Sequence, residues 1–222
     1  MGSKVHADGT VRFYPGNTVI AHLDPQQPLH GRLLGFCQRL AQLGFGEKMT
    51  FLPPASYHVT LICGVDDRLR GLHGWPRDLP INAPLALCHS FFADRLRTFD
   101  LCERPPYRLR ASAFKPGGSD LVLDLEAISG TEEHRLSRLR RDLAELLGLC
   151  APTFALHFTL GYLVKWLTPE EEHGLRLEQL AFLERLRREH LVVELGLPEY
   201  CHFQNMFSFD RQFYLGVNDD VN

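Results

Sequence analysis

The chain has 222 residues, enough for one large domain or two small lobes with a real hydrophobic core. Hydrophobic residues make up 45% and charged residues 23%, a globular composition that excludes disordered, collagenous and low-complexity classes. Lysine and arginine number 24 against 27 aspartates and glutamates, so the net charge of −3 excludes a global positive field for a long nucleic acid.

Cysteine usage and hydropathy favour a soluble protein of a reducing compartment. The six cysteines are scattered without a Cys-x-x-Cys pair, which is typical of free thiols in the cytosol. The first ten residues lack an apolar signal core, and no later stretch reaches the roughly 18 consecutive apolar residues that span a bilayer. We therefore expect a cytoplasmic protein without a membrane partner.

The first half of the chain predicts alternating strands and helices. Runs rich in apolar and β-branched residues, bounded by proline and glycine, indicate strands, and apolar residues spaced by three and four indicate helices. The expected elements are a strand at 17–24, a helix at 27–43, a strand at 57–65 and a helix at 83–99.

The second half repeats this order after Pro105-Pro106. Thr131 is the expected N-cap of one helix, and Thr168-Pro169 has the residues typical of the start of another. The expected elements are a hairpin of strands at 107–114 and 120–125, a helix at 131–148, a strand at 156–164, a helix from 168 to about 190, and closing strands at 191–195 and 206–216 with a turn near Asp210.

This order predicts an α+β fold of two pseudo-symmetric lobes, with antiparallel sheets lining a central cleft and helices outside. We expect a single bilobal domain over 1–222, with lobes at roughly 17–105 and 106–216 and with terminal strands able to cross between them.

Each half carries one tetrad of the form His, apolar, Thr, apolar. The tetrads are His58-Val59-Thr60-Leu61 and His157-Phe158-Thr159-Leu160. Side chains alternate along a strand, so His and Thr share one face and the two apolar residues share the other. One such tetrad arises by chance in roughly one chain in five of this length, and two in only a few per cent. The structural alternative for each copy is a core strand with a satisfied histidine, but the pair favours a site.

Two converging imidazoles supply what displacement at phosphorus needs. A neutral ring can take a proton from the attacking oxygen, and a protonated ring can give one to the leaving oxygen. Histidine holds either state around neutral pH, so both limbs of a pH–rate profile are expected near neutrality. The threonine hydroxyls can donate to the non-bridging phosphoryl oxygens.

The paired tetrads resemble the two-histidine (2H) phosphoesterase superfamily, whose signature is a pair of His-hydrophobic-Thr/Ser-hydrophobic motifs. The resemblance implies a bilobal fold, a metal-free mechanism and catalytic roles for His58, Thr60, His157 and Thr159. Characterised members act on cyclic phosphodiesters, including 2′,3′-cyclic phosphate RNA ends, ADP-ribose cyclic phosphate and 2′-5′ linkages. The stretch at 49–65 also looks like a little-characterised bacterial branch of that superfamily.

Three further residues are candidates for substrate binding, each with a structural alternative. Tyr57 could stack on a base, but alternation places it opposite His58, which favours core packing. Lys48, in the loop before the first motif strand, could reach a phosphate, although loop lysines are usually solvated. His22 could line the same cleft or satisfy a local hydrogen bond. Weaker candidates for the cleft border are Lys115, Phe207 and Tyr214.

Other chemistries lack their usual motifs. The sequence has no His-Glu-x-x-His, no Cys-x-x-Cys, no glycine-rich nucleotide loop and no Gly-x-Ser-x-Gly elbow, so we expect no metal and no cofactor. The arginines near His134 alternate with core leucines and are matched by acidic residues, which favours a solvated helix face over an RNA-binding surface.

The sequence thus favours a metal-independent 2H-like phosphoesterase that hydrolyses a cyclic phosphodiester on a small nucleotide, a nucleotide-sugar or an RNA terminus. We expect such a small partner, no long nucleic acid and a monomeric chain. Two alternatives stay open: a binding module that senses the same ligands without turnover, and a hydrolase of another phosphodiester, such as a lipid or a 2′-5′ oligonucleotide. Which histidine is the base, and hence whether a 2′- or a 3′-phosphate forms, stays open too.

Overall fold

The computed structural model describes residues 4–71 and 74–217. The outermost residues of the predicted domain, 1–3 and 218–222, lie outside the described residues, as do Leu72 and His73. The helices are α1 (Pro28–Ala41), α2 (Leu85–Leu96), α3 (Gly130–Leu147) and α4 (Pro169–Arg188). The strands are β1 (Gly16–His22), β2 (Met49–Phe51), β3 (His58–Asp66), β4 (Tyr107–Phe114), β5 (Asp120–Ala127), β6 (His157–Leu163), β7 (Val193–Leu195), β8 (Glu199–Asn205) and β9 (Ser208–Tyr214).

The helices form where the apolar spacing predicts them, with one correction at a helix start. The side chain of Thr168 accepts a hydrogen bond from the backbone N–H of Glu171, and the Glu171 carboxylate accepts one from the Thr168 N–H, so α4 begins with a capping box. The predicted N-cap of α3, Thr131, is wrong. Ser129 caps this helix by accepting from the N–H of Glu132, two residues earlier than predicted.

The C-terminal strands also differ from the prediction. The run at 206–216 was expected to turn near Asp210, but Asp210 lies inside β9 and pairs with His202 of β8. The turn is at Met206 and Phe207, and β8, which the sequence did not predict, precedes it. The three-residue strand β2 was also not predicted.

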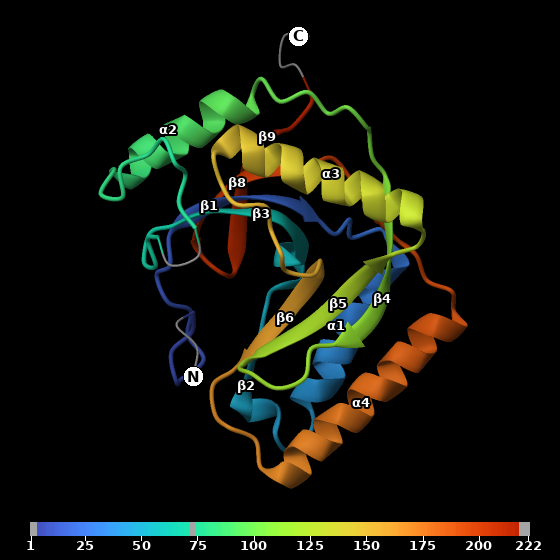
Figure 1. The fold of residues 1–222 in the computed structure, drawn as a ribbon. Coiled ribbons are helices and arrows are strands. Elements are labelled where there is room, and N and C mark those ends of the chain that lie inside the picture. Colours follow the sequence, from blue (N-terminus) through green and yellow to red (C-terminus); the bar gives the residue numbers. More distant parts are fainter. Residues whose placement is uncertain (1–3, 72–73, 218–222) are drawn as a thin grey trace.

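The strands form one strongly curled antiparallel sheet, a half-barrel with the helices outside, in the order β7-β4-β5-β6-β3-β1-β8-β9 (Figure 1). The two motif strands, β3 and β6, are neighbours at the middle of this order, with β2 added beside β6. In this order four strands lie on each side of the β3–β6 junction, with β2 as an additional strand on the β6 side, which agrees with a pseudo-two-fold arrangement. The predicted α+β class is confirmed.

The half of the sheet that contains β3 draws strands from both ends of the chain. Strand β8 pairs with β1, and β9 pairs with β8, so the C-terminal strands join the N-terminal half. The division into lobes at 17–105 and 106–216 stays a prediction.

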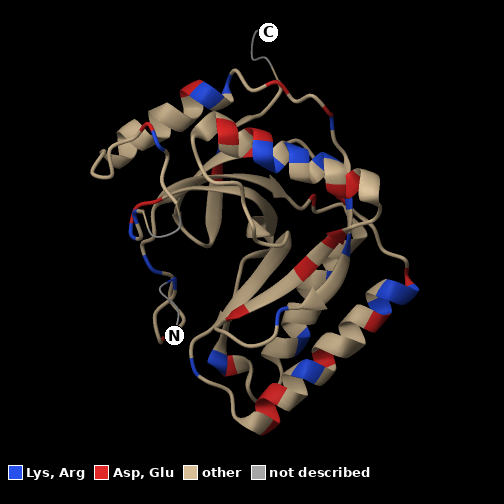
Figure 2. Cartoon of the chain, in the orientation of Figure 1, with Lys and Arg blue, Asp and Glu red and all other residues tan. Residues whose placement is uncertain are grey.

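Apolar side chains fill the space between sheet and helices, and the helices α3 and α4 are rich in charged residues. Val59, Phe158 and Phe92 are completely buried. In Figure 2 the strands β1, β3, β6 and β8 are drawn mostly tan, and bands of both charge colours cover α3 and α4. No helix in the described part of the chain is long and apolar enough to cross a membrane.

Candidate active site

The two tetrads lie side by side at the centre of the half-barrel. Val59 of β3 and Phe158 of β6 are antiparallel partners and are both fully buried. Carrying this register one residue in each direction places His58 across from Thr159, and Thr60 across from His157. The four polar side chains therefore share the face opposite the buried pair, as strand alternation predicts.

Both histidines are held by the same backbone hydrogen bond. The Nδ1 of His58 lies 2.7 Å from the carbonyl oxygen of Ser56, and the Nδ1 of His157 lies 2.8 Å from that of Ala155. A carbonyl oxygen only accepts, so each Nδ1 carries a proton and donates it. The Nε2 atom of each ring is left for a ligand. In both halves the accepting carbonyl belongs to the residue two positions before the histidine, in agreement with the pseudo-symmetry.

One cavity of about 410 Å³ is lined by all four motif residues. His58, Thr60, His157 and Thr159 are half-buried on its wall. Within the described part of the chain, neither threonine hydroxyl has a hydrogen-bond partner, so both can donate to a ligand. The volume lies within the range of small-molecule sites, so the cavity can hold a compound of about nucleotide size.

Burial sets the protonation state of His58. It lowers the pKa of His58 to about 4, against the opposing hydrogen bond to Ser56. The charges of His22 and His157 act in the same direction as burial. The ring of Phe209 contributes to this burial, because its centroid lies 4.1 Å from that of His58. His58 is therefore neutral at pH 7, the state that a proton acceptor requires.

Tyr57 and Lys48, two of the three candidates for substrate binding, do not line this cavity. Tyr57 is 1% exposed and its hydroxyl faces the Sγ of buried Cys37, so it packs in the core as alternation predicts. Lys48 pairs with Glu171 at 2.6 Å, which anchors the loop to the start of α4. The interpretation of either side chain as a substrate ligand finds no support in this geometry.

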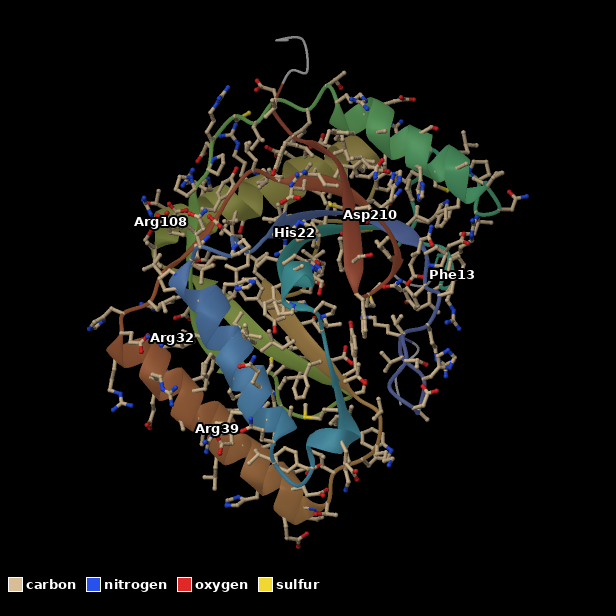
Figure 3. All side chains as sticks on the ribbon, turned by 180° about the vertical axis from the view of Figure 1, so that it is seen from behind. Phe13, His22, Arg32, Arg39, Arg108 and Asp210 are labelled. Atoms are coloured by element: carbon tan, nitrogen blue, oxygen red, sulfur yellow. The ribbon has the colours of Figure 1, made fainter. Side chains whose placement is uncertain are left out.

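His22 lies beside the cavity without lining it. It is the antiparallel partner of His58, and the two ring centroids are 6.1 Å apart in an edge-on arrangement. Its Nδ1 bonds Glu199 at 2.8 Å, which is the local partner expected as the alternative. In Figure 3 His22 lies near the centre of the molecule, whereas Arg32, Arg39 and Arg108 lie on its outside.

The aromatic and cationic wall of the site comes from residues that the motifs do not indicate. Besides Phe209, the cavity is lined by Phe154, Phe203 and Lys4. Lys4, Phe203 and Phe209 are remote from both tetrads in the sequence, so only the fold could place them at the site. Of the candidates for the cleft border, Lys115 lines an adjoining cavity that shares His157 and Thr159. Tyr214 lines a separate cavity together with His22, and Phe207 lines none of these three cavities.

One group of side chains has the donor types of a metal site. The ligand atoms of His22, Glu199 and Cys201 lie within 4.8 Å of one another. However, Glu199 already accepts from His22 and lies 3.3 Å from Arg211. Burial would raise the pKa of Glu199, but these partners outweigh it and hold the pKa below its usual value. The carboxylate is thus neutralised by protein groups, and the geometry does not require a cation.

Comparison with known proteins identifies relatives of the whole fold. A protein-family model named 2H-phosphodiest, described as a domain of unknown function (DUF1868), matches residues 4–120, which include the first tetrad. No curated protein matches the chain.

Two solved structures are similar. The conserved protein of unknown function ATU0111 from Agrobacterium tumefaciens is 27% identical, with a TM-score of 0.87 over 98% of this chain and 92% of that one. TT0787 of Thermus thermophilus is 14% identical, with a TM-score of 0.49 over 92% of this chain and 98% of that one. The similarity to the first structure therefore extends over nearly the whole chain, beyond the region that the family model matches.

The family match covers more than half of the chain, and its name agrees with the paired histidine motifs on β3 and β6. This chain belongs to the 2H-phosphodiest family of two-histidine phosphoesterases.

Proposed function

We propose that this chain hydrolyses a cyclic phosphodiester, such as the 2′,3′-cyclic phosphate of a nucleotide, an RNA end or a nucleotide-sugar. The observation that carries the proposal is that one cavity contains all four motif side chains, with both Nδ1 atoms bonded to backbone carbonyls and both Nε2 atoms left for substrate. Acid and base are thereby provided in one place, and the family assignment supports a phosphoesterase.

In the proposed reaction His58 is the base, because its lowered pKa keeps it neutral. Its Nε2 takes a proton from water while the water oxygen bonds to phosphorus. The bond from phosphorus to the ribose oxygen breaks, and that oxygen takes a proton from Nε2 of protonated His157. The hydroxyls of Thr60 and Thr159 donate to the non-bridging oxygens, where negative charge increases. The product is a phosphate monoester.

The test is turnover of a panel of 2′,3′-cyclic nucleotides by the wild type and by single variants. His58→Ala and His157→Ala should each lower kcat/KM by at least 10²-fold, the lower end of what a positioned acid or base contributes. Thr60→Val should lower it, and Thr60→Ser should restore much of the loss, because serine keeps the donor. Chelator should not change the rate. Circular dichroism and melting curves establish that each variant is folded.

The same panel distinguishes an enzyme from a binding module. Melting curves that rise with ligand while no phosphate monoester forms would favour a sensor that uses the same cavity. Full activity of either histidine variant on a substrate of the wild type would refute the proposed mechanism.

The proposed partner is a small nucleotide or an RNA terminus, bound by a monomer without a long nucleic acid or a membrane. The proposed location is the cytoplasm, in keeping with cysteines that are free thiols in the structure.

A further inference from the structure

Aromatic and apolar groups make up much of the cavity around the four motif residues. Each catalytic imidazole has a phenylalanine beside it: Phe209 at 4.1 Å from His58 and Phe154 at 6.3 Å from His157, measured between ring centroids. Phe203 lies 5.4 Å from Phe209 and extends this wall. Tyr14, Tyr162, Leu52, Leu69 and Met206 complete the apolar lining. Such a wall suits a flat aromatic group next to the reacting phosphorus.

The charges around this wall do not favour an anion. Among the described residues, the cavity is lined by one lysine, Lys4, and one carboxylate, Asp66. The adjoining cavity, of about 550 Å³, shares Lys4, His157 and Thr159 and adds Lys115, Asp120 and Asp124. Together the two cavities are lined by two lysines and three carboxylates, so the lining has no excess of positive charge.

Arg140, an arginine beside the Phe154 ring, is bound by backbone groups of the protein itself. Arg140 of α3 donates to the backbone carbonyls of Leu61 and Phe154 at 3.0 and 2.8 Å, and its guanidinium lies 4.5 Å from the centre of the Phe154 ring. Burial lowers its pKa. Arg140 thus fastens two segments that carry the motifs and does not line either cavity.

Ligand charge therefore decides which compounds fit. A cyclic phosphodiester carries one negative charge, and the two threonine hydroxyls and a protonated histidine can balance it. A further phosphate monoester adds a charge of about −1.5 to −2 at pH 7 and would lose water in a site where carboxylates outnumber lysines. An aromatic base, by contrast, gains contact with the phenylalanine wall.

We propose that the site selects a cyclic phosphodiester whose only negative charge is at the reacting phosphorus and whose substituent is an aromatic base, and that it discriminates against the same compound with an additional phosphate. This rests on the proposed function and narrows it: among the candidate substrates it favours a single nucleoside cyclic phosphate over phosphate-rich RNA ends and nucleotide-sugars.

Three compounds that differ in one group each test this selection. The first is adenosine 2′,3′-cyclic phosphate, the second is the same compound with a 5′-phosphate, and the third is methyl riboside 2′,3′-cyclic phosphate, which lacks the base. We expect kcat/KM for the first to exceed that for each of the others at least tenfold. Equal values for the first two would overturn the charge selection, and equal values for the first and third would overturn the aromatic subsite.

A melting curve with each compound separates this inference from the proposed function. If no compound is hydrolysed, the proposed function fails, while selective stabilisation by adenosine 2′,3′-cyclic phosphate would still support the recognition. Equal stabilisation by all three, or by none, would contradict the recognition as well.

A pair of charge variants tests the physical cause. Asp124, the strand partner of His157, lines the adjoining cavity, and Asp124→Asn removes one of its carboxylates. We expect this variant to lower the ratio of kcat/KM for the first compound to kcat/KM for the second several-fold. Glu133→Gln on α3 removes an exposed charge that lines neither cavity and should leave the ratio unchanged. A ratio that Asp124→Asn leaves unaltered would contradict the charge argument.

Discussion

His58 combines an ordinary backbone hydrogen bond with unusual surroundings. The Ser56 carbonyl favours the protonated ring, but enclosure by Phe209 and the neighbouring histidines favours the neutral one, and burial is the largest effect. Alternation along β3 could place this side chain on the motif face from the sequence alone. Its burial could not be predicted, because Phe209 comes from a strand some 150 residues away in the chain.

The acid limb of kcat/KM should therefore lie well below neutrality. This parameter reports the free enzyme, in which the pKa of His58 is about 4, so activity should persist to about pH 4.5 instead of declining near 6.5. Phe209→Ala should move the limb upward by exposing the ring. The measurement is a pH–rate profile, with circular dichroism at each pH to confirm folding. A limb near 6.5 in the wild type would exclude His58 as the buried base.

At the level of elements, apolar periodicity predicted the helices and most strands, and partners from elsewhere in the fold explain the misses. Strand β8 was not predicted because Glu199 and His202 interrupt its apolar run. Glu199 is buried because it accepts from His22 and Arg211, and His202 lies against the Tyr200 hydroxyl. Strand β2 has only three residues, too few for alternation to indicate a strand.

The start of α3 gives a matched pair of substitutions. Ser129 accepts from the N–H of Glu132, whereas Thr131 is exposed inside the first turn. Ser129→Ala should lower the free energy of unfolding by about 1 kcal/mol through loss of the cap, and Thr131→Ala should change it by less than about 0.5 kcal/mol. Urea unfolding of both variants measures the difference. The reverse ranking would restore Thr131 as the cap.

Helix α2 packs on β8 through two stacked imidazoles. The ring centroids of His89 and His202 are 3.7 Å apart, and the Tyr200 hydroxyl donates to the backbone carbonyl of His89 and lies 3.2 Å from Nε2 of His202. Burial lowers the pKa of both histidines, that of His202 to about 4, and the charge of His89 lowers the pKa of His202 as well. Asp67 and Asp210 act in the opposite direction.

This stack should make stability depend on pH in a defined window. The folded-state pKa of His202 is below the unfolded value near 6.5, so the unfolded chain binds the proton more readily. The stabilisation is therefore complete above about pH 6.5 and is lost as the pH falls towards 4. His202→Gln keeps a donor for Tyr200 and should flatten the decline of Tm over this range, with the exposed His134→Gln as control. An unchanged decline would show that the stack is not its source.

At the level of the whole molecule, the site exists because the two halves of the half-barrel meet. Strands β3 and β6 pair through Val59 and Phe158, and the motif histidines and threonines flank this pair on both strands. The sequence could predict two strands with matching faces. That they become neighbours, and that Phe154, Phe203 and Lys4 close around them, depends on contacts between segments far apart in the chain, which no local pattern contains.

Phe158→Leu should therefore reduce activity more than its cost in stability explains. Phe158 and Phe92 are both completely buried, and replacing either by leucine should lower the free energy of unfolding by about 1 kcal/mol. Only Phe158 joins the motif strands, and a small shift there changes the separation of the two imidazoles, to which acid–base catalysis is sensitive. We expect kcat/KM to fall at least tenfold in Phe158→Leu and less than twofold in Phe92→Leu, assayed well below both melting temperatures. Equal losses would mean that this junction contributes stability alone and does not set the geometry of the site.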